Sequence, residues 1–230
     1  KNTPVALAMR KLPEMLILMV GIAAAGGVFV FMNAWWTSKE LGYALDDSGA
    51  KTIFADGTRA ERLKLGQSDK GLTLLGVRDG EETLDLAYSE FIRKKDKKGW
   101  PEHGLQSDDD FAIMYSSGTT GYPKGVLLTH RGAISAVFSW LMQGLIAEIL
   151  VLKEDHTAET GPRDVILIAT PLFHVTATHP NFLFSLAAGA KLCLLAKWNA
   201  EEAVKSIEEE RVTRFLGVST QSADPMEAAK

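Results

Sequence analysis

The sequence predicts an α/β protein with a layered, mostly parallel sheet and helices on both of its faces. Two observations lead to this fold class. Short, continuously apolar runs alternate with segments of helical length along most of the 230 residues, which is typical of parallel strands joined by helical crossovers. The composition, with 46% hydrophobic and 23% charged residues, is that of a folded globular chain.

The charge and cysteine content exclude other classes of protein. The net charge of −4 at pH 7 gives no indication of nucleic-acid binding, which usually requires a basic domain. Cys193 is the only cysteine, so the chain cannot form an internal disulfide. A reducing compartment, and therefore a cytoplasmic location, is favoured.

The longest apolar stretch covers residues 15–32, which contain no charge over eighteen positions. Its length alone makes it a candidate for a membrane span. However, Gly26 and Gly27 interrupt it, and the residues before them favour a helix whereas Val28–Phe31 favours a strand. We therefore predict a first strand at Val5–Met9, then a buried helix, a glycine stop and a buried parallel strand, with no membrane span.

The next segment predicts a helix followed by further strands. Thr37 and Glu40 have the spacing of a capping box, and Gly49 is placed to end the helix that they open. The basic run 93–98 is interpreted as a solvated helix end or loop. Strands are predicted at Lys51–Ala55, Leu72–Val77, Phe111–Tyr115 and Val126–Leu128.

The second half continues the alternation. A long helix is predicted from Thr129 or His130 to about Leu150, followed by a polar loop at 154–163. Asn199, with Glu202 three positions later, is predicted to cap a helix that runs to Arg211. The other predicted elements are a helix at Asn181–Ala188 ended by Gly189, and strands at Val165–Ile168, Lys191–Leu195 and Val212–Val218.

The segment Tyr115–Gly125, which reads YSSGTTGYPKG, lies between two predicted strands and has the composition of an anion-binding loop. Its glycines permit positive φ angles and let backbone N–H groups approach a ligand closely. Hydroxyl donors and one lysine complete a cradle suited to the phosphates of a nucleotide. The alternative is a polar hairpin loop without a ligand. The positions assigned to nucleotide binding are Ser116, Ser117, Gly118, Thr119, Thr120, Gly121, Lys124 and Gly125.

The loop is neither a Walker A motif nor a dinucleotide-binding fingerprint, because it lacks Gly-Lys-Ser/Thr and Gly-x-Gly-x-x-Gly. It resembles the phosphate-binding loop of the adenylate-forming superfamily, which includes acyl- and aryl-CoA ligases, firefly luciferase and the adenylation domains of peptide synthetases. The family pattern is matched from Ser116 to Gly125 without a gap. The resemblance extends over the whole chain.

A second motif of the same family is matched at 169–176, which reads ATPLFHVT. The resemblance implies that His174 lines the pocket for the acyl group and the nucleotide, although alone it would be read as a packed core histidine. Ala177 replaces the glycine that is usual after this motif, which leaves the local backbone in doubt. His130 and His179 are interpreted as structural, because no metal-binding spacing surrounds them.

The flanking segments 28–37 and 127–132 resemble those of bacterial long-chain fatty-acyl-CoA ligases. The resemblance implies a two-step reaction, in which a carboxylic acid, with a fatty acid favoured, is activated by ATP to an acyl-adenylate and then transferred to CoA. Lys124 and His174 are the residues assigned to catalysis. ATP, Mg²⁺ and CoA are the implied cofactor and co-substrates, and the ligands of Mg²⁺ are left unassigned.

The motifs that this family uses for the ribose, and its small C-terminal lid, do not occur in the sequence. Residues 1–230 are therefore predicted to be a fragment of the large AMP-binding domain that does not make acyl-CoA by itself. Two alternatives stay open, namely a different adenylating enzyme and a non-catalytic nucleotide-binding remnant. Peripheral membrane association and homodimerisation also stay open.

Overall fold

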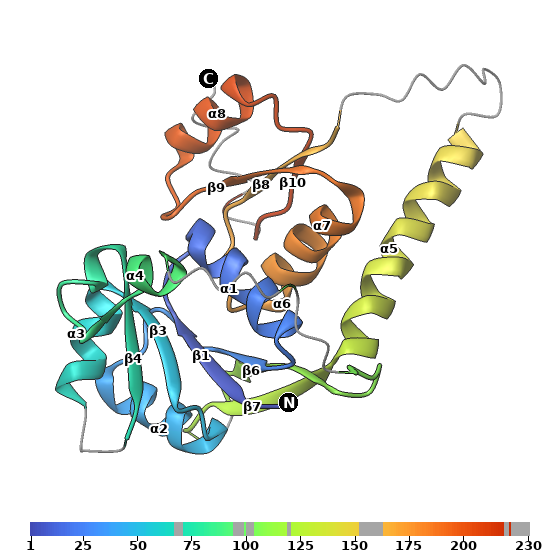
Figure 1. Cartoon of the computed structure of the whole chain (residues 1–230). Helices are drawn as coiled ribbons and strands as arrows, with labels where there is room; N and C mark the ends of the chain where they lie inside the picture. The colour runs from blue at the N-terminus through green and yellow to red at the C-terminus, as the bar shows by residue number, and fades with distance from the viewer. Residues whose placement is uncertain are drawn as a thin grey trace. The chain divides into compact units, whose positions relative to one another are not determined.

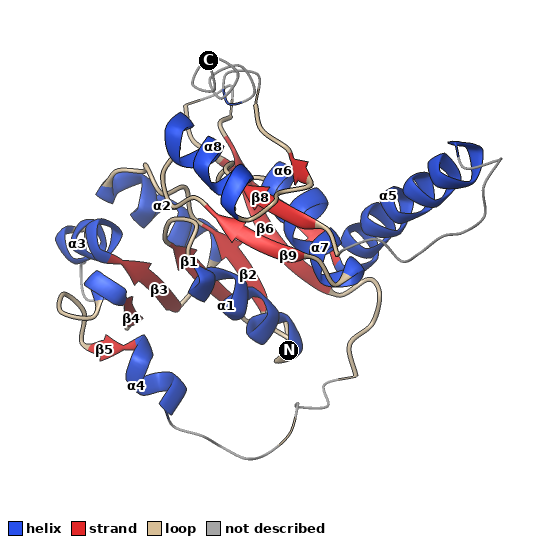
Figure 2. Ribbon diagram, turned by 90° about the horizontal axis from the view of Figure 1, so that it is seen from above, coloured by secondary structure: helices blue, strands red, loops and turns tan. Residues whose placement is uncertain are grey.

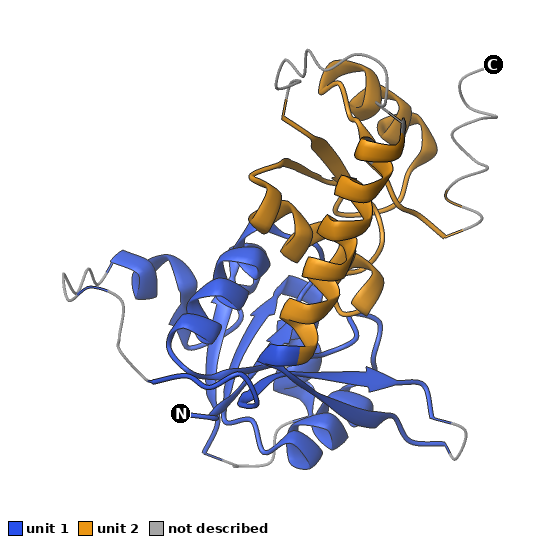
Figure 3. Cartoon of the chain, turned by 90° about the vertical axis from the view of Figure 1, so that its right-hand side faces the viewer, with its two compact units in different colours: residues 1–131 blue, residues 132–230 orange. Residues whose placement is uncertain are grey.

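The computed structural model describes residues 1–66, 71–93, 99, 104–118, 121–151, 163–218 and 221. The chain divides into two compact units, residues 1–131 and residues 132–230 (Figure 3). Among the described residues, none of the helices combines the length and the apolar character that crossing a membrane requires.

The described part of the first unit is built on a seven-stranded sheet with the order β5-β4-β3-β1-β2-β6-β7 (Figure 1). Neighbouring strands are parallel, except that β6 and β7 are antiparallel. The predicted mostly parallel α/β fold is thereby confirmed. The strands are β1 (Pro4–Ala8), β2 (Val28–Phe31), β3 (Thr52–Asp56), β4 (Thr73–Val77), β5 (Leu86–Ala87), β6 (Asp110–Ser116) and β7 (Lys124–Thr129).

Helices cover both faces of this sheet, as predicted. Helices α2 (Ser38–Ser48) and α3 (Gly57–Leu65) lie on one face, and α1 (Pro13–Ala24) and α4 (Tyr88–Arg93) lie on the other (Figure 2). A short 3-10 turn, η1 (Arg78–Gly80), follows β4. The sequence did not predict α3, α4 or β5. The basic run begins where α4 ends, and its residues 94–98 lie outside the described residues.

The apolar stretch 15–32 divides at its glycines as predicted. Helix α1 ends at Ala24, Gly26 has a φ of 72°, and β2 begins at Val28. A Cβ on Gly27 would lie 3.2 Å from the carbonyl oxygen of Thr3. The pair therefore allows the chain to reverse tightly between a helix and a strand that are both buried.

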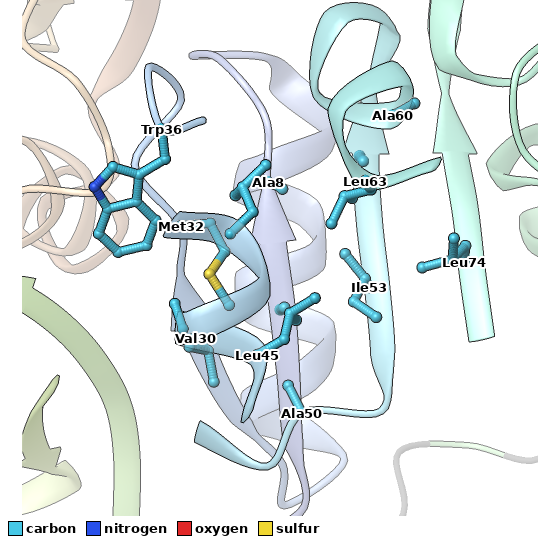
Figure 4. Packing of buried hydrophobic residues seen from close by; sticks show 14 of the residues in the cluster. Ala8, Val30, Met32, Trp36, Leu45, Ala50, Ile53, Ala60, Leu63 and Leu74 are labelled. Carbon is cyan, nitrogen blue, oxygen red and sulfur yellow. The ribbon is translucent and has the colours of Figure 1, made fainter. Parts of the chain in front are cut away.

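Helix α2 packs its buried residues against the sheet. Its capping box is formed as predicted, because Glu40 N donates to Thr37 Oγ1 at 3.4 Å and Thr37 N donates to Glu40 Oε2 at 2.8 Å. The helix ends at Gly49, whose φ is 67°. Figure 4 shows the core between α2, α3 and the sheet, which includes Val30, Met32, Trp36, Leu45, Ala50, Ile53, Ala60, Leu63 and Leu74.

In its described part, the second unit holds a parallel sheet of three strands with the order β10-β8-β9. The strand predicted at Val212–Val218 is wrong in length, because only Arg214–Phe215 pairs with β8. The loop predicted at 154–163 lies largely outside the described residues. The elements are α5 (His130–Val151), β8 (Val165–Ile168), α6 (Val175–Ala177), the π-helical η2 (Thr178–Leu183), α7 (Phe184–Ala188), β9 (Lys191–Leu194), α8 (Ala200–Glu209) and β10 (Arg214–Phe215).

The predicted caps of the second unit are present. Asn199 Oδ1 accepts a hydrogen bond from Glu202 N at 2.8 Å and so begins α8. Gly189 ends α7 with a φ of 66°. Helix α8 ends at Glu209, two residues before the predicted end.

Candidate functional site

The predicted phosphate loop joins the two strands of the β6–β7 hairpin. Ser116 pairs with Lys124, Tyr115 with Gly125, and the ladder continues to the far end of both strands. Ser116 Oγ donates to the carbonyl oxygen of Lys124 at 3.5 Å. The loop is therefore carried on a rigid platform at the edge of the sheet. A connection this short cannot form a parallel crossover, which identifies the hairpin from sequence alone.

Gly118 occupies a position that no other residue can fill without a change in the loop. Its φ is 59°, and a Cβ atom there would lie 2.3 Å from the carbonyl oxygen of Tyr122. Gly121 also has a positive φ, of 96°. Both glycines therefore have the backbone conformation that the sequence predicted. Thr119 and Thr120, predicted to bind nucleotide, lie outside the described residues.

Gly125, which the motif assigns to nucleotide binding, is a strand residue in the structure. It lies within β7 and does not have a positive φ. A Cβ atom at Gly125 would lie 3.1 Å from Ile113 Cγ2 and 3.4 Å from Asp47 Oδ2. Its missing side chain therefore leaves room for Ile113 of the neighbouring strand β6, with Asp47 of α2 at ordinary contact distance.

The polar side chains of the described part of the loop face solvent. Ser116, Ser117 and Lys124 are all exposed. Because the ammonium group and the two hydroxyls lie around glycines in tight turns, they can reach a ligand that also approaches the backbone N–H groups. This combination of one cation with several neutral donors suits a polyphosphate.

Tyr115 connects the first end of the loop to α2. Its hydroxyl donates to Asp47 Oδ2 at 2.8 Å and lies 3.1 Å from the carbonyl oxygen of Ala44. Its ring makes an edge-to-face contact with Trp36, at 5.3 Å between centroids. Burial, and then the hydrogen bond to Asp47, raises the pKa of Tyr115 well above its ordinary value, so the hydroxyl stays a donor.

Tyr122 connects the other end of the loop to the same helix. Its ring centroid lies 4.8 Å from that of Tyr43, with the planes tilted by 32°. A groove of about 500 Å³ opens beside these two rings. The residues that line it are Ser38, Lys39, Gly42, Tyr43, Asp46, Gly66 and Tyr122. Tyr43 and Asp47 could not be predicted from the sequence, because nothing local indicates that α2 contacts the loop.

His174 belongs to the second unit, where it immediately precedes α6. Its side chain is exposed, and its ring centroid lies 4.6 Å from that of Phe173. It is therefore not a packed core histidine. Partial desolvation lowers the pKa of His174, which favours a neutral imidazole at neutral pH.

Ala177, which replaces the glycine of the family motif, has an unstrained backbone conformation. Ala177 has φ −84° and ψ −37°, which any L residue adopts, and its N–H donates to the carbonyl oxygen of His174 at 3.1 Å. The doubt that the missing glycine raised is thereby removed. His179 is buried and His130 packs edge-to-face on Phe111, both as structural residues would.

The described residues do not offer a dedicated magnesium site. No group of three or more His, Cys, Asp or Glu residues among them could hold a metal ion. The described loop provides hydroxyls and an ammonium group, whereas Mg²⁺ prefers carboxylates, water and phosphate oxygens.

Comparison with known proteins identifies the family. The model of the AMP-binding enzyme family matches residues 1–229. A 4-coumarate–CoA ligase 3 from Arabidopsis thaliana is 30% identical over 215 residues, covering 93% of this chain and 36% of that protein. A 4-coumarate:CoA ligase 1 from Petunia hybrida is 29% identical over 201 residues, covering 87% of this chain and 35% of that protein. The chain belongs to the AMP-binding enzymes, the adenylate-forming superfamily.

Solved structures agree with this assignment. The inhibitor-bound N-terminal domain of FACL13 from Mycobacterium tuberculosis is 29% identical, with a TM-score of 0.81. The match covers 100% of this chain and 54% of the FACL13 chain. A long-chain fatty-acid CoA ligase described as putative, from Rhodopseudomonas palustris, shares the fold at 19% identity, also with a TM-score of 0.81. The chain spans about a third of the length of the curated relatives named above.

Proposed function

We propose that the protein activates a carboxylic acid with ATP and transfers the acyl group to CoA. The observation that carries this proposal is the uninterrupted loop Ser116–Gly125, held on a hairpin with Gly118 where no side chain fits. Membership of the AMP-binding enzymes supports the chemistry. Because the chain spans only part of its relatives, the activity is proposed for the protein in the length that its gene encodes.

In the first step, a carboxylate oxygen attacks the α-phosphorus of ATP. A bond forms between that oxygen and phosphorus, and the bond from phosphorus to the α,β-bridging oxygen breaks, so pyrophosphate leaves with its electron pair. The loop holds the β- and γ-phosphates, and the Lys124 ammonium stabilises the charge that develops on the leaving group. The hydroxyls of Ser116 and Ser117 and backbone N–H groups complete the cradle.

In the second step, the thiolate of CoA attacks the acyl carbon and AMP leaves. We assign His174 to the pocket of the reacting carboxylate. The desolvation that lowers its pKa keeps the imidazole uncharged near neutral pH. A neutral imidazole donates a hydrogen bond to the acid without holding it as a fixed ion pair, which suits a carboxylate that must move onto phosphorus.

We propose a fatty acid as the substrate. Similarity to a structure described as a fatty acyl CoA synthetase from Mycobacterium tuberculosis, which is 28% identical and covers 94% of this chain, supports this choice. The 4-coumarate–CoA ligases among the relatives favour an aromatic acid as the second candidate. Acyl-CoA formation with palmitate and with 4-coumarate, measured side by side, separates the two.

The test of the proposed function is Lys124→Ala in the protein that the gene encodes. We expect the rate of ATP–pyrophosphate exchange to fall by about 10²–10³, because one preorganised charge is lost. The KM for the acid should stay unchanged. Lys205→Ala removes an exposed lysine from α8 and serves as the matched control. An unchanged exchange rate together with a raised KM for the acid would show that Lys124 does not act on the phosphates.

A further inference from the structure

Both ends of the phosphate loop are attached to one face of helix α2. Tyr115 immediately precedes the loop, and its hydroxyl bonds to Asp47 at 2.8 Å. Tyr122 lies at the end of the loop, and its ring contacts Tyr43 at 4.8 Å between centroids. Positions 43 and 47 are four residues apart and therefore lie one above the other on the helix. Helix α2 thus contacts the loop on both sides of its glycines.

We propose that α2 sets the position of the phosphate loop, with Tyr43 and Asp47 as positioning residues for the nucleotide step. This inference rests on the proposed function and deepens it. Neither residue needs to touch the nucleotide. Each acts through a loop tyrosine, so its effect should appear in the use of ATP and not in the binding of the acid.

Helix α2 is rigid enough for this purpose. The capping box at Thr37 fixes its beginning and Gly49 fixes its end. On its other side, Leu41, Ala44 and Leu45 are buried in the core that joins α2 to the sheet. A side chain on α2 therefore has a fixed place relative to β6, on which the loop begins.

The contact of Tyr115 with α2 lies beside Gly125. A Cβ atom on Gly125 would lie 3.4 Å from Asp47 Oδ2 and 3.4 Å from Cε1 of the Tyr115 ring. The hydrogen bond persists over the working pH range of proteins, because the raised pKa of Tyr115 keeps its proton in place. Asparagine at position 47 would keep an acceptor, whereas alanine would remove it.

The contact of Tyr122 is the more exposed of the two. The Tyr122 side chain is 50% exposed, and the groove of about 500 Å³ opens beside it. Removing the Tyr43 ring would enlarge this groove and leave one side of Tyr122 facing water. Tyr122 is adjacent to Gly121, and its carbonyl lies against Gly118, so a shift of Tyr122 moves the glycine turns directly.

The experiment compares Tyr43→Ala, Tyr43→Phe and Phe91→Ala in the protein that the gene encodes. Phe91 makes a similar aromatic contact with Phe54, at 5.9 Å, and is the matched control. We expect Tyr43→Ala to lower kcat/KM for ATP in pyrophosphate exchange by about fivefold, the worth of one aromatic contact. The KM for the acid should be unchanged. Tyr43→Phe, which keeps the ring, should stay within about twofold of the wild type.

A second measurement needs no activity. Amide hydrogen exchange of peptides containing Ser117, Gly118 and Tyr122 should be faster in Tyr43→Ala without nucleotide, and unchanged in Phe91→Ala. Asp47→Ala should show the same acceleration, with Asp47→Asn restoring slow exchange. Equal behaviour of Tyr43→Ala and Phe91→Ala in both measurements would overturn the inference.

The outcomes also separate this inference from the proposed function. If Lys124→Ala abolishes pyrophosphate exchange while Tyr43→Ala behaves like Phe91→Ala, the function stands and the inference about α2 is wrong. If the wild-type protein catalyses no exchange, the proposed function is wrong. In that case faster amide exchange in Tyr43→Ala would show only that Tyr43 stabilises the loop. The assignment of Tyr43 and Asp47 to the nucleotide step would then be wrong.

Discussion

Replacing Gly118 by alanine is expected to destroy the phosphate loop while leaving the sheet folded. At a φ of 59°, an L residue costs about 1–2 kcal/mol. The larger effect is steric, because the new Cβ would lie 2.3 Å from the Tyr122 carbonyl oxygen, about 1.1 Å inside ordinary contact. The loop must open by about that distance, and a misplacement of about 1 Å can cost 10²-fold in rate.

Gly189→Ala is the control that introduces backbone strain without a steric clash. Gly189 has a φ of 66°, but a Cβ there would meet nothing within 4 Å. Each variant should lower the Tm by about 2–8 °C, since 1 kcal/mol shifts a chain of this size by about 2–4 °C. Only Gly118→Ala should lose pyrophosphate exchange, by about 10²-fold. Exchange in Gly118→Ala within threefold of that in Gly189→Ala would refute the reasoning.

Two further predictions concern stability. Thr37→Ala removes the cap of α2 and should lower the free energy of unfolding by about 1 kcal/mol, or the Tm by about 2–4 °C. Thr37→Ser keeps the cap and should melt close to the wild type. Equal Tm values of the two variants would contradict this prediction. Burial lowers the pKa of Lys11 from 10.5 to about 8, so between these values the unfolded chain binds more protons and stability rises with pH. The free energy of unfolding, measured by urea denaturation at pH 8 and pH 10, should rise with pH in the wild type and not in Lys11→Met. An equal rise in both proteins would disprove the prediction.

The early part of the fold could be predicted because its signals are local. The division of the apolar stretch follows from Gly26 and from the change from helix-forming to strand-forming residues across it. The capping box at Thr37 and the left-handed glycine at position 49 define α2 without reference to the rest of the chain. Such signals are properties of adjacent residues, so the sequence contains them in full.

Helix α3 could not be predicted for the opposite reason. Its sequence, GTRAERLKL, is mostly polar, and the side chain of its N-cap residue Asp56 makes no capping hydrogen bond. Arg59 is nonetheless buried, paired with the equally buried Asp56. Gly57 is buried against the Asp79 carboxylate, which accepts its N–H at 3.0 Å. A pattern that assigns every charged residue to the surface does not recognise a buried helix face that includes Arg59.

The candidate site likewise combines features that local sequence predicts with contacts between distant residues that it does not predict. The glycines of the loop indicated tight turns, and Gly118 and Gly121 have them. The contact of Tyr115 with Asp47 joins residues 68 positions apart, and no local pattern specifies it. The tight turns of the loop are therefore predictable from the sequence, whereas the residues of α2 that contact the loop are known only from the folded structure.

The hairpin also has a consequence for how the chain folds. Ser116 and Lys124 are separated by 8 positions, whereas Phe29 and Ala112, which pair β2 with β6, are separated by 83. Loop-closure entropy makes the second pairing about 2 kcal/mol costlier to nucleate than the first. An isolated hairpin is only marginally stable, however. The turn that carries Gly118 and Gly121 is thus quick to close, but it lasts only when the distant parallel pairing has been completed.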